Sequence, residues 1–132
     1  MPVYNEEEKI EKCLKSIREQ DYKGDIEIVF VDDNSTDRTL EIAKKFKIKL
    51  VVNGKHDYDI GKSLGIKAAT GDYITFLDGD NILTTKDWIK KIISPLLEDQ
   101  TIIGSQPLWF KYNKKDKFFD RYCTLYGITD PL

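Results

Sequence analysis

The feature that most limits the possible folds of this chain is a regular alternation of short apolar segments with amphipathic helical segments. The segment 26–31 (IEIVFV) is almost continuously apolar, as expected of a strand covered on both faces. The following segment instead places Leu40, Ile42, Ala43 and Phe46 at helical spacing. Strands are predicted at 26–31, 48–52, 73–77 and 101–109, and helices at 6–20, 36–46, 60–69, 86–96 and 118–126. This order predicts an α/β domain with a largely parallel sheet.

Polar residues of the usual capping types stand where three of these helices begin. Asn5 precedes three glutamates and is predicted to cap the first helix, because acids suit its positive end. Asn34 or Ser35 is expected to cap the second, and Thr85 the fourth.

Length and composition indicate an ordinary folded domain. The 132 residues suffice for one hydrophobic core, so we expect a single domain over 1–132. No apolar run approaches the roughly 20 residues that a membrane helix requires. Cys13 and Cys123 lack CxxC spacing, which favours reduced thiols in a cytoplasmic protein over the alternative of a disulfide. The net charge of −2 gives no reason to expect nucleic acid as a partner.

Carboxylates cluster directly after two of the predicted strands. Asp32 and Asp33 follow 26–31, and Asp78 and Asp80 follow 73–77. Ligands bind beyond the carboxyl ends of strands in such sheets. For Asp32 a simple capping role remains the alternative. Two carboxylates one residue apart repel each other unless a cation or proton is shared, so the second pair predicts a Mg²⁺ or Mn²⁺ site.

Other catalytic patterns are incomplete in this chain. The stretch 60–63 (IGKS) ends like a phosphate-binding loop, but His56 stands where its first glycine is required. Because His56 is the only histidine, a serine-histidine-aspartate triad is not expected, and His56 is interpreted as an exposed loop residue. The segment around Asp78 also resembles the first motif of haloacid-dehalogenase-like phosphatases, yet Ile82 replaces their threonine. That phosphatase is therefore the weaker enzymatic alternative.

Three motifs in order resemble the signatures of family 2 glycosyltransferases. They are Pro2-Val3-Tyr4-Asn5-Glu6, the segment 31–37 (VDDNSTD) and the segment 69–81 (ATGDYITFLDGDN). The resemblance covers about the first hundred residues. It implies the GT-A fold, a Rossmann-like three-layer sandwich with a mostly parallel sheet, here incomplete.

The resemblance also implies the donor site of a nucleotide-diphosphate sugar. Pro2 and Tyr4 match the segment that lines the base, Glu6 matches an acid near the nucleotide, and Asp33 matches the carboxylate that hydrogen-bonds the base. Asp78 and Asp80 match the DxD motif, which holds Mn²⁺ or Mg²⁺ and the donor diphosphate. Lys62 lies where many members have an arginine, and a lysine there can still reach a phosphate. The implied donor-site residues are Pro2, Tyr4, Glu6, Asp33, Lys62, Asp78 and Asp80, with Asp78 and Asp80 as metal ligands.

Two departures indicate a fragment. The family has an apolar strand before the first motif, where this chain begins with Met1, and its catalytic base is an acid in a later acceptor-side segment. Neither Asp120 nor Asp130 stands in that context, so the base is expected outside this chain. The resemblance implies transfer, with inversion, from a UDP- or GDP-sugar to a glycan or lipid-linked acceptor. A non-catalytic nucleotide-binding module is the alternative.

A basic stretch near the C-terminal end of the chain bears on where the protein lies in the cell. It is interpreted as a solvated helix face, with a patch that meets lipid phosphates at the cytoplasmic face of a membrane as the alternative. Its members are Lys111, Lys114, Lys115, Lys117 and Arg121.

Overall fold

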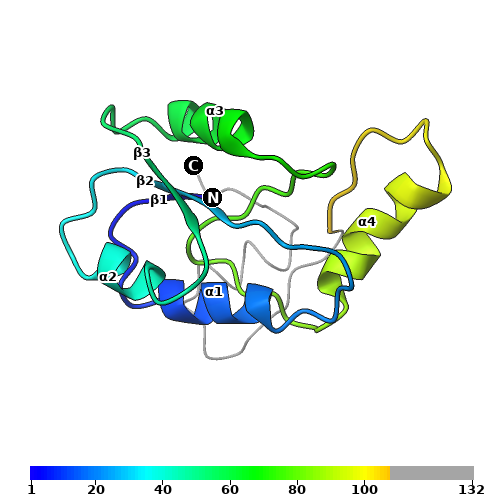
Figure 1. The fold of residues 1–132 in the computed structure, drawn as a ribbon, viewed down its shortest axis with the longest axis horizontal. Helices are drawn as coiled ribbons and strands as arrows, with labels where there is room; N and C mark the ends of the chain where they lie inside the picture. Colours follow the sequence, from blue (N-terminus) through cyan, green and yellow to red (C-terminus); the bar gives the residue numbers. More distant parts are fainter. Residues whose placement is uncertain (108–132) are drawn as a thin grey trace, which may run out of the picture. The chain divides into compact units, whose positions relative to one another are not determined.

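The computed structural model describes residues 1–107, and these contain a small sheet of three parallel strands. The strands are β1 (Pro2–Val3), β2 (Val29–Asp32) and β3 (Lys49–Val52), in the spatial order β1-β2-β3. Val31 of the central strand pairs with Pro2 on one side and with Val51 on the other. The predicted parallel sheet is therefore confirmed for the first part of the chain (Figure 1).

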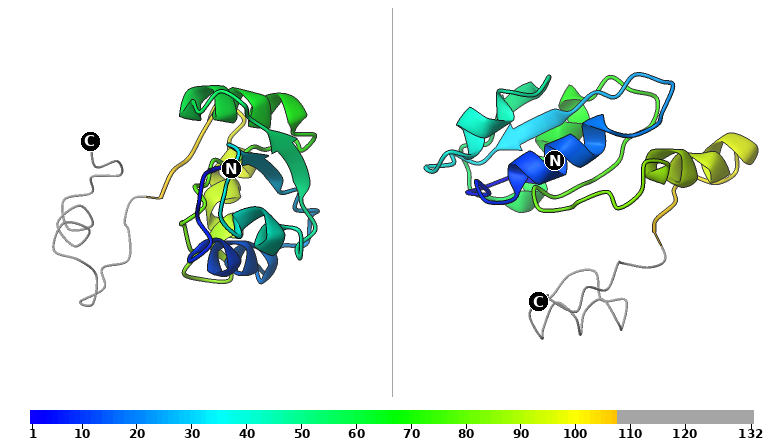
Figure 2. Two further views of the ribbon diagram at one scale, coloured as in Figure 1. Left: turned by 90° about the vertical axis from the view of Figure 1, so that its left-hand side faces the viewer. Right: turned by 90° about the horizontal axis from the view of Figure 1, so that it is seen from below.

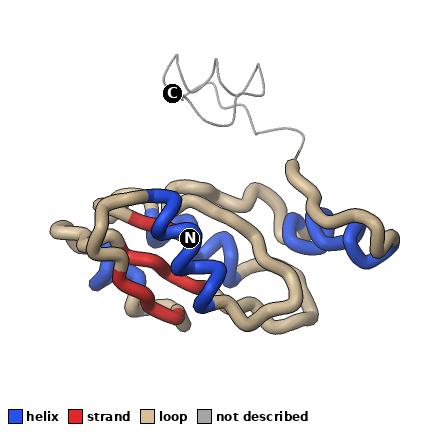
Figure 3. Tube along the Cα trace, turned by 90° about the horizontal axis from the view of Figure 1, so that it is seen from above, coloured by secondary structure: helices blue, strands red, loops and turns tan. Residues whose placement is uncertain are grey.

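Helices cover both faces of this sheet. Helices α1 (Ile10–Arg18) and α2 (Thr39–Ala43) lie on one face, and α3 (Tyr58–Ala68) lies on the other (Figures 1 and 2). Figure 3 shows the strands in red and the helices in blue, seen from above. Parallel strands need crossover connections, and the helices supply them.

The core lies between α1, α2 and the sheet. Helix α1 buries one stripe of apolar side chains, which recur at helical spacing. Phe30 of β2 is fully buried and belongs to the same cluster. The buried members of the stripe are Ile10, Cys13, Leu14 and Ile17.

The chain divides into two compact units, Met1–Ile89 and Lys90–Leu132. Helix α4 (Trp88–Glu98) begins at the end of the first unit and contains Pro95, and Ser105 donates a hydrogen bond from its hydroxyl to the carbonyl of Ile92. No helix among residues 1–107 has the length and apolar character needed to cross a membrane.

Several local predictions are wrong. The segment 73–77 is not a strand, and Tyr73, Ile74 and Phe76 are each about half exposed. Its apolar residues favour a strand, but a strand needs a hydrogen-bonded neighbour, and the described sheet contains only β1, β2 and β3. Asn5 does not cap α1, which begins at Ile10. Its side-chain oxygen instead accepts a hydrogen bond from the backbone of Thr36, 2.8 Å away.

Other element boundaries also shift. Helix α2 begins later than predicted, at Thr39, without a side-chain cap at Arg38. Residues 101–107 form no strand. The remainder of that predicted strand, the predicted helix 118–126 and the basic stretch at 111–121 lie outside the described residues.

Candidate functional site

The carboxyl ends of the three strands meet along one edge of the sheet, because the strands are parallel. The loops that follow them begin at Tyr4, Asp33 and Asn53. Hydrogen bonds join the first two loops: the backbone N–H of Asn5 donates to the Ser35 hydroxyl over 3.1 Å, and Thr36 donates to Asn5 as described above. The edge is thus built from loops bound to one another.

Each of these loops contains one residue in the left-handed backbone region. The φ angles are 50° at Asn5, 59° at Asn34 and 48° at His56. Asparagine tolerates this conformation, whereas histidine adopts it less readily. Such conformations cost of order 1–3 kcal/mol and persist only where surrounding contacts enforce them, often at functional sites.

Asp33 and His56 face each other across two loops. The backbone N–H of His56 donates to Oδ1 of Asp33 over 3.0 Å, and Nδ1 of His56 lies 3.4 Å from Oδ2. The Tyr4 ring meets the His56 ring edge-on, with 5.6 Å between centroids. Asp32, by contrast, is buried and accepts a hydrogen bond from the backbone N–H of Ser35. The capping alternative is wrong, because α2 begins only at Thr39, after Arg38.

The acidic pair, Asp78 and Asp80, lies against the loop that follows β1. Gly79 is buried, and a Cβ placed there would come within 3.2 Å of the Val3 methyls and 3.3 Å of Cγ of Glu6. This close approach brings Glu6, Asp78 and Asp80 together. Partial burial raises the pKa of Glu6, the charges of Asp80 and Asp78 add to this effect, and Lys9 opposes it.

Each carboxylate of the acidic pair already has a partner. Nζ of Lys9 lies 3.2 Å from Oδ2 of Asp80. The Tyr58 hydroxyl donates a hydrogen bond to Oδ1 of Asp78. The ammonium of Lys62 lies over the Tyr58 ring, 4.0 Å from its centroid. Helix α3 therefore brings Tyr58 to Asp78, with Lys62 over the Tyr58 ring.

The donor atoms fit Mg²⁺ or Mn²⁺, which prefer oxygen ligands and fill their other positions with water and phosphate. Asp78 and Asp80 supply such oxygens. Among residues 1–107 no three acidic, histidine or cysteine side chains converge as a metal-binding group. A cation here would therefore depend on ligands from a bound diphosphate.

Tyr4, Glu6 and Asp33 lie in loops at the carboxyl edge of the sheet, and Asp78 and Asp80 lie against the first of these loops. The other two predicted residues, Pro2 and Lys62, lie within β1 and α3. Pro2 packs against the first turn of α3, where a Cβ on Gly61 would come within 3.3 Å of its ring. The sequence prediction did not include His56, Tyr58 or Lys9. Their contacts depend on loops that are far apart in sequence, and only the position of His56 in the loop that follows β3 offered a signal.

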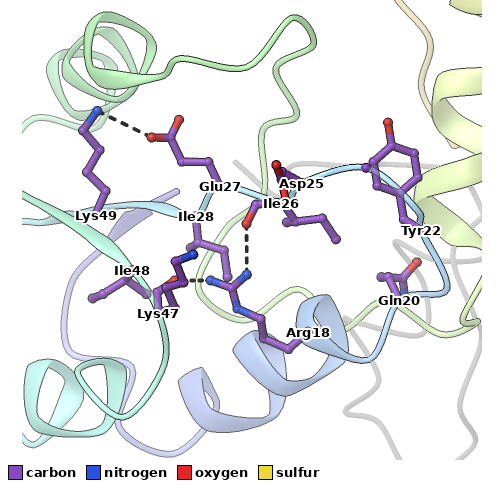
Figure 4. Close-up of a pocket in the computed structure, with 11 residues that line it drawn as sticks. Arg18, Gln20, Tyr22, Asp25, Ile26, Glu27, Ile28, Lys47, Ile48 and Lys49 are labelled. Atoms are coloured by element: carbon purple, nitrogen blue, oxygen red, sulfur yellow. Dashed lines mark hydrogen bonds and ion pairs between the residues drawn. The ribbon is translucent and has the colours of Figure 1, made fainter.

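The opposite end of the strands holds a hollow of about 550 Å³ that contains none of the predicted site residues. Arg18 closes it by donating to the carbonyls of Ile26, over 2.9 Å, and Lys47 (Figure 4). Glu27 and Lys49 form an ion pair at its rim, with 3.5 Å between Oε1 and Nζ. These contacts join the segment before β2 to the segment before β3 and to α1, which is a structural role.

The chain resembles known proteins over most of its length. The family model described as glycosyl transferase family 2 matches residues 1–129. The chain is 32% identical over 124 residues to glycosyltransferase GlyA of Streptococcus pneumoniae, covering 90% of this chain and 17% of that protein. It is 37% identical over 90 residues to the GalNAc(5)-diNAcBac-PP-undecaprenol beta-1,3-glucosyltransferase of Campylobacter jejuni, covering 63% and 29%.

A solved structure shares the fold. The mannosyltransferase PcManGT of Pyrobaculum calidifontis, in complex with GDP-Man and Mn²⁺, superposes with a TM-score of 0.67 at 26% identity, covering 94% of this chain and 36% of that one. The chain spans less than half the length of each of these three proteins. The chain belongs to glycosyl transferase family 2 and has the GT-A fold.

Proposed function

We propose that this chain is the donor-binding part of a glycosyltransferase that uses a nucleotide-diphosphate sugar. The observation that carries the proposal is the meeting of two different carboxylate sites at one edge of the sheet. Asp33 lies beside two aromatic rings, and Asp78 and Asp80 lie beside Glu6, Lys9 and Tyr58. A nucleoside diphosphate needs both kinds of site, one for its base and one for its phosphates.

The proposed roles follow from the chemistry of each group. Asp33 accepts N–H donors of the base, and Tyr4 and Pro2 line the base. Asp80 and Asp78 hold the cation with the diphosphate, and Glu6 lies beside them. Lys62, 4.0 Å from the Tyr58 ring, lies within a flexible side chain's reach of the same phosphates. When bound, Mn²⁺ or Mg²⁺ supplies positive charge that stabilises the departing diphosphate.

The transfer itself would be a displacement at the anomeric carbon of the sugar. An acceptor oxygen forms the new glycosidic bond while the bond to the diphosphate breaks, with inversion. No described residue is assigned as the base that takes the acceptor proton. The acceptor class is proposed to be a glycan or a lipid-linked sugar, since one relative is named for an undecaprenol-linked substrate. We place the enzyme in the cytoplasm, in reach of a membrane surface.

Calorimetry with UDP, GDP and CMP, each with Mn²⁺ and with chelator, tests the donor site. We expect one nucleoside diphosphate to bind in the presence of Mn²⁺ and about tenfold or more weakly with chelator. Asp80→Ala should abolish the Mn²⁺ effect. Asp25→Ala removes an equal charge from an exposed position before β2 and should keep it.

The contrary outcomes are specific. A folded chain that binds none of these nucleotides, or binds one equally with and without Mn²⁺ and in Asp80→Ala, contradicts the proposed site. Nucleotide binding by a longer form of the protein that includes the acceptor-side segment, without transfer of the sugar from the matching donor, would instead support the non-catalytic nucleotide-binding module.

A further inference from the structure

His56 presents two different groups to the carboxylate of Asp33. Its backbone N–H donates to Oδ1 and its ring nitrogen Nδ1 lies near Oδ2, at the two distances given above. The left-handed φ of 48° at His56 lets its backbone and its ring face the same side chain. A carboxylate offers about four lone-pair positions, so Asp33 keeps capacity for a ligand's N–H donors.

The two rings beside Asp33 stand almost at right angles. The angle between the Tyr4 and His56 rings is 83°. The Tyr4 residue is 50% exposed and the His56 side chain 59%, whereas the Asp33 side chain is only 17% exposed. Tyr4, His56 and Asp33 thus form a corner. The two rings are its accessible walls, and the Asp33 carboxylate is a sheltered hydrogen-bond acceptor where they meet.

This corner suits a flat heteroaromatic ring that carries N–H groups. Such a ring can stack on one wall, meet the edge of the other and donate to the carboxylate. Aliphatic or fully hydroxylated ligands would use only part of this surface. The chemistry therefore favours a nucleobase over a sugar at this position.

We propose that His56 is a specificity-determining residue for the nucleobase of the donor. It forms the second wall of the corner and fixes the orientation of the Asp33 carboxylate, so that Asp33 points its free lone pairs at the base. This inference rests on the proposed function, because it assigns the base of the same donor. His56 is the exposed loop residue that the sequence predicted, and the proposal assigns it a role.

The variant His56→Asn tests this role without disturbing the backbone. Asparagine adopts the left-handed region more readily than alanine, so the backbone donor to Asp33 is retained while the ring is removed. The neighbouring exposed residue gives the matched control Lys55→Asn. Thermal unfolding of both variants shows whether each remains folded.

Calorimetry with Mn²⁺ compares two probes, the preferred nucleotide of UDP, GDP and CMP, and inorganic pyrophosphate. In His56→Asn we expect nucleotide affinity to fall about tenfold, pyrophosphate affinity to stay within about twofold, and the preference between UDP and GDP to narrow. In Lys55→Asn the ratio of nucleotide to pyrophosphate affinity should not change, even where loss of its charge weakens both. Comparing the two probes distinguishes contacts with the nucleobase from contacts with the phosphates.

Two results would overturn the inference while leaving the proposed function intact. One is unchanged nucleotide affinity and selectivity in a folded His56→Asn variant. The other is an equal loss for nucleotide and pyrophosphate, which would mean a general structural effect. If the unmodified chain binds no nucleotide at all, the proposed function fails first, and the inference fails with it.

Discussion

The hydroxyl of Thr39, at the start of α2, is hydrogen-bonded to the loop that follows β1. Thr39 is fully buried, and its Oγ1 accepts a hydrogen bond from the backbone N–H of Glu6 over 2.7 Å. Thr39→Val keeps the branched shape but removes this acceptor. A part-buried N–H left without its partner costs about 1–3 kcal/mol. Thr39→Ser keeps the acceptor and removes one buried methyl group, which costs about 1 kcal/mol.

The two variants differ most clearly in ligand binding. Both should lower the free energy of unfolding measured with urea, but only Thr39→Val should also weaken Mn²⁺-dependent nucleotide binding, because it releases the backbone of Glu6. Circular dichroism across a urea titration and calorimetry give the two quantities. If the free energy of unfolding of Thr39→Val lies within about 0.5 kcal/mol of that of the unmodified chain, the hydrogen bond does not contribute as argued. If both variants bind nucleotide equally well, the link from Thr39 to the loop that follows β1 is refuted.

Three further predictions concern the core and the ionisable groups. Phe30→Ala should lower the free energy of unfolding by about 3–5 kcal/mol in urea titration, because Phe30 is fully buried; a loss under about 1 kcal/mol would contradict this. Burial raises the pKa of Cys13 to about 12, so in a Cys123→Ser background a thiol reagent at pH 8 should label Cys13 only after unfolding, and rapid labelling of the native chain would count against it. The backbone N–H of Thr70 is the main cause that lowers the pKa of Glu27 below its ordinary 4.5, so Glu27 stabilises the fold above pH 4.5 and this contribution disappears as the pH falls through the lowered value. The stability difference between the unmodified chain and Glu27→Gln should therefore be present at pH 7 and vanish in acid, and a difference that persists at pH 2 would refute it.

Local sequence rules predicted the central part of the fold well. The runs that form β2 and β3 are rich in β-branched residues, and their predicted positions are confirmed within three residues at each end. The helix predicted at 6–20 forms as α1 and buries one apolar stripe. Both patterns are set by burial of side chains close together in sequence, which periodicity records directly.

The wrong predictions share a different cause, which is competition from distant partners. Asn5 has the chemistry of a helix cap, but Thr36 in another loop binds its side chain instead. The segment 73–77 has a strand pattern and lacks a paired neighbour. The placement of His56 beside Asp33 depends on a left-handed backbone angle and on two loops meeting, and neither is visible in a local pattern.

The all-parallel pairing has a consequence for how the chain folds. Pro2 pairs with Val31, and Val29 pairs with Lys49, so every strand contact joins residues far apart in sequence. Such non-local pairing requires loop closure before any contact forms, and folding is correspondingly slow. The loops that would hold a nucleotide are bound to each other across the same separations, so they take shape only when the sheet does. A ligand at this edge would therefore slow unfolding while leaving the rate of folding almost unchanged.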